Sequence, residues 1–77
     1  MKVHETVETL GLLCPLPVLK ARKRLQALEA GQILQLIADD PAARIDVPHF
    51  CNEQDHRLIA VQESGRGWIF TIAKGPS

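Results

Sequence analysis

Residues 11–38, GLLCPLPVLKARKRLQALEAGQILQLIA, contain the pattern that determines the fold we expect for this chain. Between Pro15 and Glu29, apolar residues recur at steps of three and four, which is typical of an amphipathic helix. These residues are Val18, Ala21, Leu25 and Leu28. Pro15 suits the first helical position, and Gly31 suits the left-handed residue just past a helix end. The mostly apolar run 33–38 then predicts a strand that is covered on at least one face.

Another strand is expected before this helix. Val3 and Val7 belong to a pattern with a period of two, which ends near Thr9 or Leu10, before Gly11. Strand, helix and strand then form a βαβ unit, in which the two strands are parallel and the crossover is right-handed. The carboxyl ends of both strands therefore lie at one edge of the sheet, where open α/β sheets usually place their sites.

The second half of the chain predicts a shorter helix and a hairpin. Residues 39–41 suit a turn or a helix start, but Asp46 is the better N-cap for a helix with one apolar side. That side contains Val47, Phe50, Cys51 and Gln54. Residues 57–63 and 68–74 are rich in branched and aromatic residues, and 64–67 has the composition of a hairpin loop. Trp68 and Phe70 are expected to fill the core or cover the sheet.

The expected architecture is α+β, with the order βαβαββ. A mixed four-stranded sheet with two helices on one face is the economical two-layer sandwich for these elements. We expect residues 1–77 to form a single domain, since 77 residues leave no room for a second one. Hydrophobic residues make up 45% of the chain, enough to build the core that a domain with only two cysteines must rely on.

The composition of the chain also argues against some classes of function. Basic and acidic residues number nine each and aromatic residues make up 4%, so direct nucleic-acid binding has little support. The first residues lack an apolar leader segment, and no run approaches the length of a membrane span. We therefore expect a cytoplasmic protein with reduced thiols, whose partner is a protein or a small molecule.

Cys14 is the leading candidate for chemistry, because it lies where a strand end meets a helix N-terminus. The N-terminus of a helix favours a thiolate over a thiol, and Cys14 takes the place of an N-cap. Pro15, Leu16 and Pro17 form a stiff support that presents the sulfur without rearrangement. The alternative is a small apolar residue that precedes a helix and is buried, as free cysteines often are.

Charged residues on both sides of Cys14 are candidates for partner docking. The first helix has a basic side, whose ordinary role is solvation, and an acidic pair follows the second strand at the same sheet edge. The docking candidates are Lys20, Lys23, Arg24, Asp39 and Asp40. The two aspartates would also oppose formation of a thiolate at Cys14 by like-charge repulsion, so a strongly acidic thiol does not follow.

At this point the chain resembles a family, the TusA/SirA-like sulfur carriers. Their motif, C-P-x-P at the start of the first helix of a βαβαββ sandwich, is here Cys14-Pro15-Leu16-Pro17. The resemblance extends over nearly the whole chain. It includes the flanking segments Leu10-Gly11-Leu12, Asp39-Asp40-Pro41, Asp46-Val47-Pro48 and Phe50-Cys51.

The resemblance implies a covalent carrier rather than a stand-alone enzyme. Cys14 would accept sulfane sulfur from a cysteine desulfurase or a rhodanese-like sulfurtransferase, hold it as a persulfide, and yield it to the thiol of an acceptor protein. The family's pathways include thiolation of the wobble uridine of tRNA, supply of the molybdenum cofactor and sulfur oxidation. The sequence does not select among them, and no cofactor is implied.

Two other hypotheses remain open at this stage. The domain could be a non-covalent interaction or regulatory module in which Cys14 is dispensable, or Cys14 and Cys51 could form a redox switch. For Cys51, burial as a small hydrophobe is the simpler interpretation. His49, Cys51 and His56 lack the spacing of a zinc site, so no metal is predicted. His4 is most simply an unpartnered surface histidine.

Overall fold

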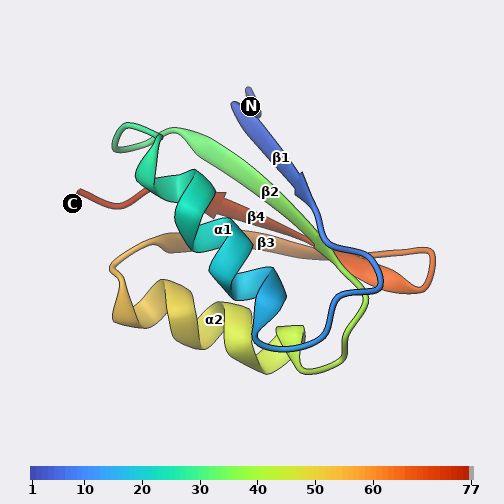
Figure 1. Ribbon diagram of the computed structural model, residues 1–77. Helices are drawn as coiled ribbons and strands as arrows, with labels where there is room; N and C mark the ends of the chain where they lie inside the picture. The colour runs from blue at the N-terminus through green and yellow to red at the C-terminus, as the bar shows by residue number, and fades with distance from the viewer. Residues whose placement is uncertain (77) are drawn as a thin grey trace.

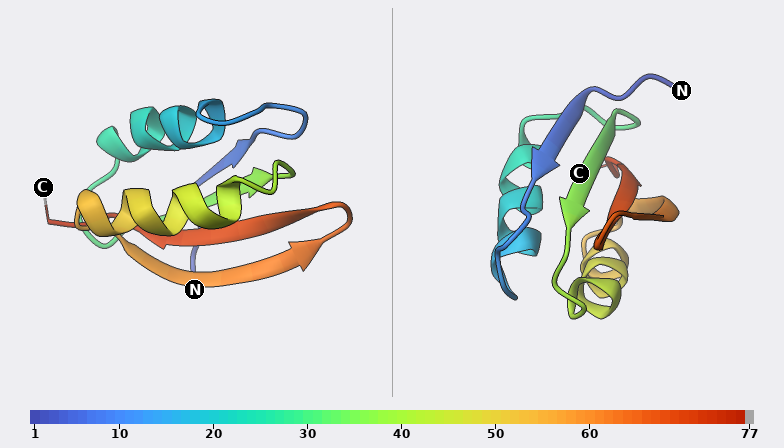
Figure 2. Two further views of the ribbon diagram at one scale, coloured as in Figure 1. Left: turned by 90° about the horizontal axis from the view of Figure 1, so that it is seen from below. Right: turned by 90° about the vertical axis from the view of Figure 1, so that its right-hand side faces the viewer.

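The computed structural model describes residues 1–76 and confirms the order βαβαββ (Figure 1). The strands and helices are β1 (Glu5–Glu8), α1 (Leu16–Gln26), β2 (Ile33–Ala38), α2 (Ala43–Glu53), β3 (Arg57–Ser64) and β4 (Gly67–Ala73). Both helices lie on one face of the sheet, α1 across β1 and β2 and α2 beside it (Figures 1 and 2). The α+β two-layer sandwich expected from the sequence is the observed architecture.

The sheet is mixed, with the strand order β1-β2-β4-β3. β1 and β2 are parallel, with Val7 opposite Leu36, as the βαβ pattern predicts. β4 pairs antiparallel with β2 on one side and with β3 on the other, and a register shift between Leu58 and Ala60 interrupts the β3 ladder. The chain thus places the carboxyl ends of β1 and β2 at the same edge, where their following loops meet (Figure 1).

The core lies between the helices and the covered face of the sheet. The sheet contributes Leu34, Leu36, Phe70 and Ile72, each of which is fully buried. From the helices come the buried residues Ala21, Leu25, Val47, Phe50 and Cys51. The apolar side predicted for α1 therefore faces the sheet, and Val18, Leu28 and Trp68 pack at the margin of this core.

The sequence predicted the strands and helices themselves more accurately than the residues at which they end. β1 is shorter than the expected strand because only residues 5–8 have partners in β2, although backbone bonds from His4 and Thr9 continue the pairing by one residue on each side. Helix α1 ends at Gln26, not Glu29, because its last turn closes with tighter bonds to carbonyls three residues back. Gly31 has the expected left-handed φ of 88°, but in a separate turn after the helix.

The predicted start of α2 was wrong. The helix begins at Ala43, about one turn before Asp46, and Asp46 lies in its first turn instead of capping it. The N-cap residue is Ala42, and no side chain caps the helix. Asp40 forms a turn just before it: its Oδ1 accepts a hydrogen bond from the Ala42 amide at 3.1 Å, and its carbonyl accepts one from the Ala43 amide at 2.9 Å. Pro48 lies inside the helix.

Candidate functional site

The Cys14 thiol lies in the loop between β1 and α1, and the loop after β2 holds this segment in place. The Cys14 amide donates a hydrogen bond to Asp40 Oδ2 at 2.7 Å, across 26 residues of sequence. The Gly11 amide donates to Asp39 Oδ1 at 2.9 Å. The acidic pair predicted as a docking surface is thus half-buried and binds the Cys14 loop. Contact of this pair with a partner stays a prediction.

The N-terminus of α1 does not offer free backbone amides to the Cys14 sulfur, contrary to expectation. Pro15, rather than Cys14, occupies the N-cap position, and the Cys14–Pro15 peptide bond is cis. The Cys14 amide is taken by Asp40, and the Leu16 amide donates to the Leu13 carbonyl at 2.9 Å. Pro15 and Pro17 have no N–H, so the nearest backbone donors are either used or absent. The two amides that the sequence placed near the sulfur are therefore bound within the loops and are not free to stabilise a thiolate.

The side chains around Cys14 disfavour its thiolate form. The hydrogen bond of the thiol to Asp46 raises the pKa of Cys14, and desolvation and the negative charges of Asp46 and Asp40 raise it further. Repulsion from Asp40 was expected from the sequence, whereas the larger effect of Asp46 was not. These surroundings favour the thiol over the thiolate at the exposed sulfur.

The residues of the motif divide into a buried support and an exposed rim. Pro17 is buried against the core, whereas Pro15 is exposed. Leu16, expected to support the site, is 45% exposed, and its neighbours Leu13 and Leu19 are 69% and 49% exposed. These three leucines, which we call the leucine rim, form an apolar surface beside the thiol.

A groove of about 280 Å³ extends from Cys14 between α1 and α2. Its lining includes Val18, Leu19 and Arg22 from α1, and Asp46, His49, Phe50, Glu53 and Gln54 from α2. Sequence reasoning missed this groove and the place of Asp46 beside Cys14. The segment Asp46-Val47-Pro48 belonged to the family resemblance, but its acidic residue had been interpreted as a helix cap.

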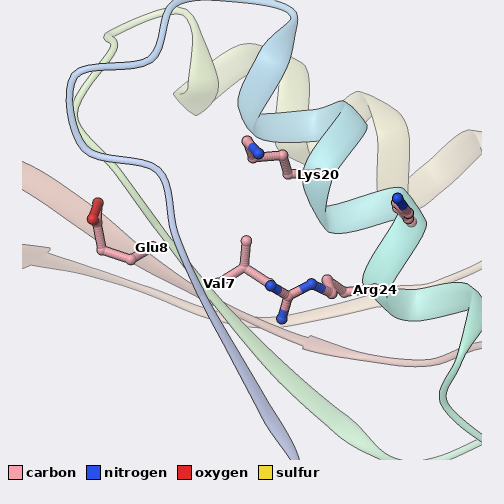
Figure 3. Close-up of a pocket in the computed structure, with 5 residues that line it drawn as sticks. Val7, Glu8, Lys20 and Arg24 are labelled. Carbon is pink, nitrogen blue, oxygen red and sulfur yellow. The ribbon is translucent and has the colours of Figure 1, made fainter.

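Three basic residues of α1, all except Arg22, line a separate hollow on the other side of the helix. Figure 3 shows Lys20 and Arg24 on α1, facing Val7 and Glu8 of β1. Lys23 completes the lining of this hollow, whose volume is about 240 Å³. Arg24 forms an ion pair with Glu5. The predicted basic side of the helix is present and exposed, and its role in docking remains a prediction.

The remaining candidate residues, Cys51, His49 and His56, are accounted for by structural contacts or by burial. Cys51 is 2% exposed in the core, as the simpler interpretation expected, and burial raises its pKa to about 11. Its inaccessible thiol argues against the Cys14–Cys51 redox switch. His49 is exposed and lies 3.3 Å from Glu53, and His56 Nδ1 accepts the Gly75 amide at 2.9 Å. Within residues 1–76, no group of three or more His, Cys, Asp or Glu side chains is arranged to hold a metal ion.

His4 is neither unpartnered nor near Cys14. Its Nδ1 accepts a hydrogen bond from the Ile33 amide at 3.0 Å, at the start of β2. This is the sheet end opposite the Cys14 loop, because β1 and β2 run parallel. His4 is thus a surface histidine, as expected, but it has a hydrogen-bond partner, and it cannot act as a base for Cys14.

The fold and the site together define a small α/β sandwich that presents one thiol at the carboxyl edge of its parallel strands. Residues 5–74 match the model of the family described as sulfurtransferase TusA, and the chain belongs to this family. The resemblance carried by Cys14-Pro15-Leu16-Pro17 is thereby confirmed at the level of the family.

A solved structure agrees with this assignment. The crystal structure of a SirA-like protein from Desulfitobacterium hafniense is similar to this chain, with a TM-score of 0.81 and 26% sequence identity. The similarity covers 92% of this chain and 97% of that chain. Among the helices that the structure describes, none is long and apolar enough to cross a membrane.

Proposed function

We propose that this protein is a sulfur carrier in which Cys14 accepts a sulfane sulfur as a persulfide and yields it to the thiol of an acceptor protein. The observation that carries the proposal is the contrast in exposure of the two cysteines, Cys14 at the surface and Cys51 in the core. A carrier needs one accessible sulfur on a rigid support. Backbone bonds to Asp39 and Asp40 and the buried Pro17 supply that support here.

The transfer step is an exchange at sulfur. The Cys14 thiolate attacks the outer sulfur of a persulfide on the donor, a new S–S bond forms to Cys14, and the S–S bond of the donor breaks. The donor leaves as a thiolate and takes up a proton, equivalent to the one that Cys14 lost. The acceptor repeats the same exchange on the Cys14 persulfide. No external oxidant or reductant is needed, because the oxidised sulfur moves as a unit.

The surface around Cys14 favours proteins over small molecules as partners. The leucine rim provides apolar surface beside the reactive atom, which a partner protein would cover. The proposed donor is a cysteine desulfurase or a rhodanese-like sulfurtransferase in the cytoplasm, and the proposed acceptor is a sulfur-relay protein, for example in tRNA thiolation or sulfur oxidation.

Intact-protein mass spectrometry after incubation with a cysteine desulfurase and free cysteine tests the proposal. We expect the wild type and Cys51→Ser to gain one sulfur atom that a reductant removes, and Cys14→Ser to gain none. Cys51→Ser is the matched control, since it removes the other thiol by the same change. Circular dichroism verifies that both variants are folded.

Two results would contradict the carrier function. One is a gain of sulfur by Cys14→Ser equal to that of the wild type. The other is the absence of a gain in every variant with both classes of donor, each shown to be active on another acceptor, while partners still bind Cys14→Ser. The second outcome would favour the non-covalent interaction module.

A further inference from the structure

The acidic surroundings of Cys14 are unexpected for a nucleophile. Thiol exchange proceeds through the thiolate, and reactive cysteines ordinarily lie in electropositive surroundings. Cys14 instead shares its groove with Asp46, and its own amide is bound by the carboxylate of Asp40 at 2.7 Å. The proposed function leaves this arrangement unexplained.

The other charged groups of the groove do not offset these carboxylates near the sulfur. Helix α1 contributes Arg22, and α2 contributes His49 and Glu53 in addition to Asp46. His49 Nε2 lies 3.3 Å from Oε1 of Glu53, which is one turn further along α2. Among the described groups, only carboxylates contribute by charge to the raised pKa of Cys14.

We propose that Asp46, together with Asp40, keeps Cys14 slow to react in the free protein, and that a partner with a basic side chain beside its own reactive sulfur relieves this restraint on docking. This inference rests on the proposed function and identifies the kind of partner that the site accepts. Asp46 is a positioning residue in this scheme: it accepts the hydrogen bond of the thiol and takes no part in the S–S exchange.

The physical argument is one of charge compensation. A Lys or Arg of the partner that pairs with Asp46 removes both the hydrogen-bond acceptor of the thiol and the nearby negative charge. The thiolate then forms only where a partner of the right charge is docked. An unpartnered disulfide or oxidant meets a thiol instead, so the carboxylates protect the carrier from side reactions and select its partners.

The first test uses the protein without a partner. The rate of Cys14 alkylation by the neutral reagent iodoacetamide is measured from pH 6 to 10 in the wild type, in Asp46→Asn and in Glu53→Gln. At neutral pH we expect Asp46→Asn to react about three- to tenfold faster than the wild type, because its gain in thiolate exceeds the accompanying loss of nucleophilicity. Glu53→Gln removes the same charge in the same groove and is expected to react like the wild type.

The second test supplies a cation on a small probe. Exchange of Cys14 with the cationic disulfide cystamine is compared with exchange with the neutral bis(2-hydroxyethyl) disulfide, each rate being divided by that of a small neutral thiol. We expect the wild type and Glu53→Gln to prefer cystamine several-fold at low salt, and Asp46→Asn to lose most of this preference. Added salt should reduce the preference in the wild type.

The outcome of these two tests does not depend on whether the protein can be loaded with sulfur. Equal pH profiles for Asp46→Asn and the wild type, with both proteins folded by circular dichroism, would overturn the proposal. An equal acceleration in Glu53→Gln would do so as well, since it would indicate a general field instead of Asp46. Loss of persulfide loading concerns the proposed function alone, because alkylation and disulfide exchange require only the Cys14 thiol.

Discussion

The two cysteines of this chain occupy opposite surroundings. Cys14 lies exposed in a loop at the sheet edge, whereas Cys51 is 2% exposed in the core beneath α2. Both thiols have a raised pKa, but for different reasons. Carboxylates, Asp46 foremost, raise that of Cys14, and burial raises that of Cys51.

Of these two kinds of pKa shift, only the one at Cys14 can serve a function. Burial is part of the fold, so the Cys51 thiol becomes reactive only when the core opens. Asp46, the first cause of the shift at Cys14, lines the groove beside the thiol, where a docked partner would reach it. A raised pKa at an exposed thiol is therefore adjustable, whereas the same direction of shift in the core marks an inert side chain.

The largest expected effect concerns Cys51 and alkaline pH. Because burial raises its pKa from 9.0 to about 11, its contribution to the free energy of unfolding is complete below pH 9 and is lost as the pH rises through 11. The loss amounts to roughly 2 to 3 kcal/mol. Urea denaturation at pH 8 and pH 11 measures it, and the chain contains no tyrosine to titrate in the same range.

The control for this prediction is Cys51→Ala, which has no thiol to ionise. We expect it to be less stable than the wild type at pH 8 by about 1 to 2 kcal/mol, because of the cavity, but to lose less stability on going to pH 11. Equal losses in the two proteins would show that Cys51 does not differ from an exposed thiol, and the comparison of the two cysteines would break down.

A smaller effect is expected at the support of the Cys14 loop. Asp40→Ala removes the acceptor of the Cys14 amide and that of the Ala42 amide at the start of α2. We expect a loss of about 1 to 2 kcal/mol in the free energy of unfolding, measured by denaturant titration. Asp40→Asn keeps an acceptor oxygen and should lose less. Stability unchanged in Asp40→Ala would mean that the loop is held by other contacts.

The smallest effect is expected for the basic side of α1. Lys20→Glu should slow sulfur loading by a desulfurase about two- to fivefold at low ionic strength, with no measurable difference at about 0.5 M salt, because surface charge acts on the encounter of proteins. Lys2→Glu makes the same charge change at the far end of β1. Equal rates in the two variants would remove the basic side from the docking surface, leaving the leucine rim.

The architecture could be predicted because its signals are local. The period of α1, the apolar run of β2 and the loop at 64–67 each specify one element, and the handedness of βαβ units then leaves few topologies. Element ends were less predictable because they depend on pairing partners. β1 is as long as its neighbour allows, and α2 starts directly after the turn that Asp40 forms with the Ala42 amide.

From the sequence alone, the family of the protein and the sheet edge on which Cys14 lies could be assigned, since motif and strand order are written in consecutive residues. The packing of the elements added the largest influence on the pKa of Cys14. Asp40, whose effect the strand order already implied, binds the Cys14 loop from the loop after β2, whereas Asp46, the first cause of the raised pKa, comes close through the packing of α2 against α1. Electrostatic effects on a thiol depend on distance in space, and the start of α2, about one turn earlier than its sequence suggests, sets that distance for Asp46.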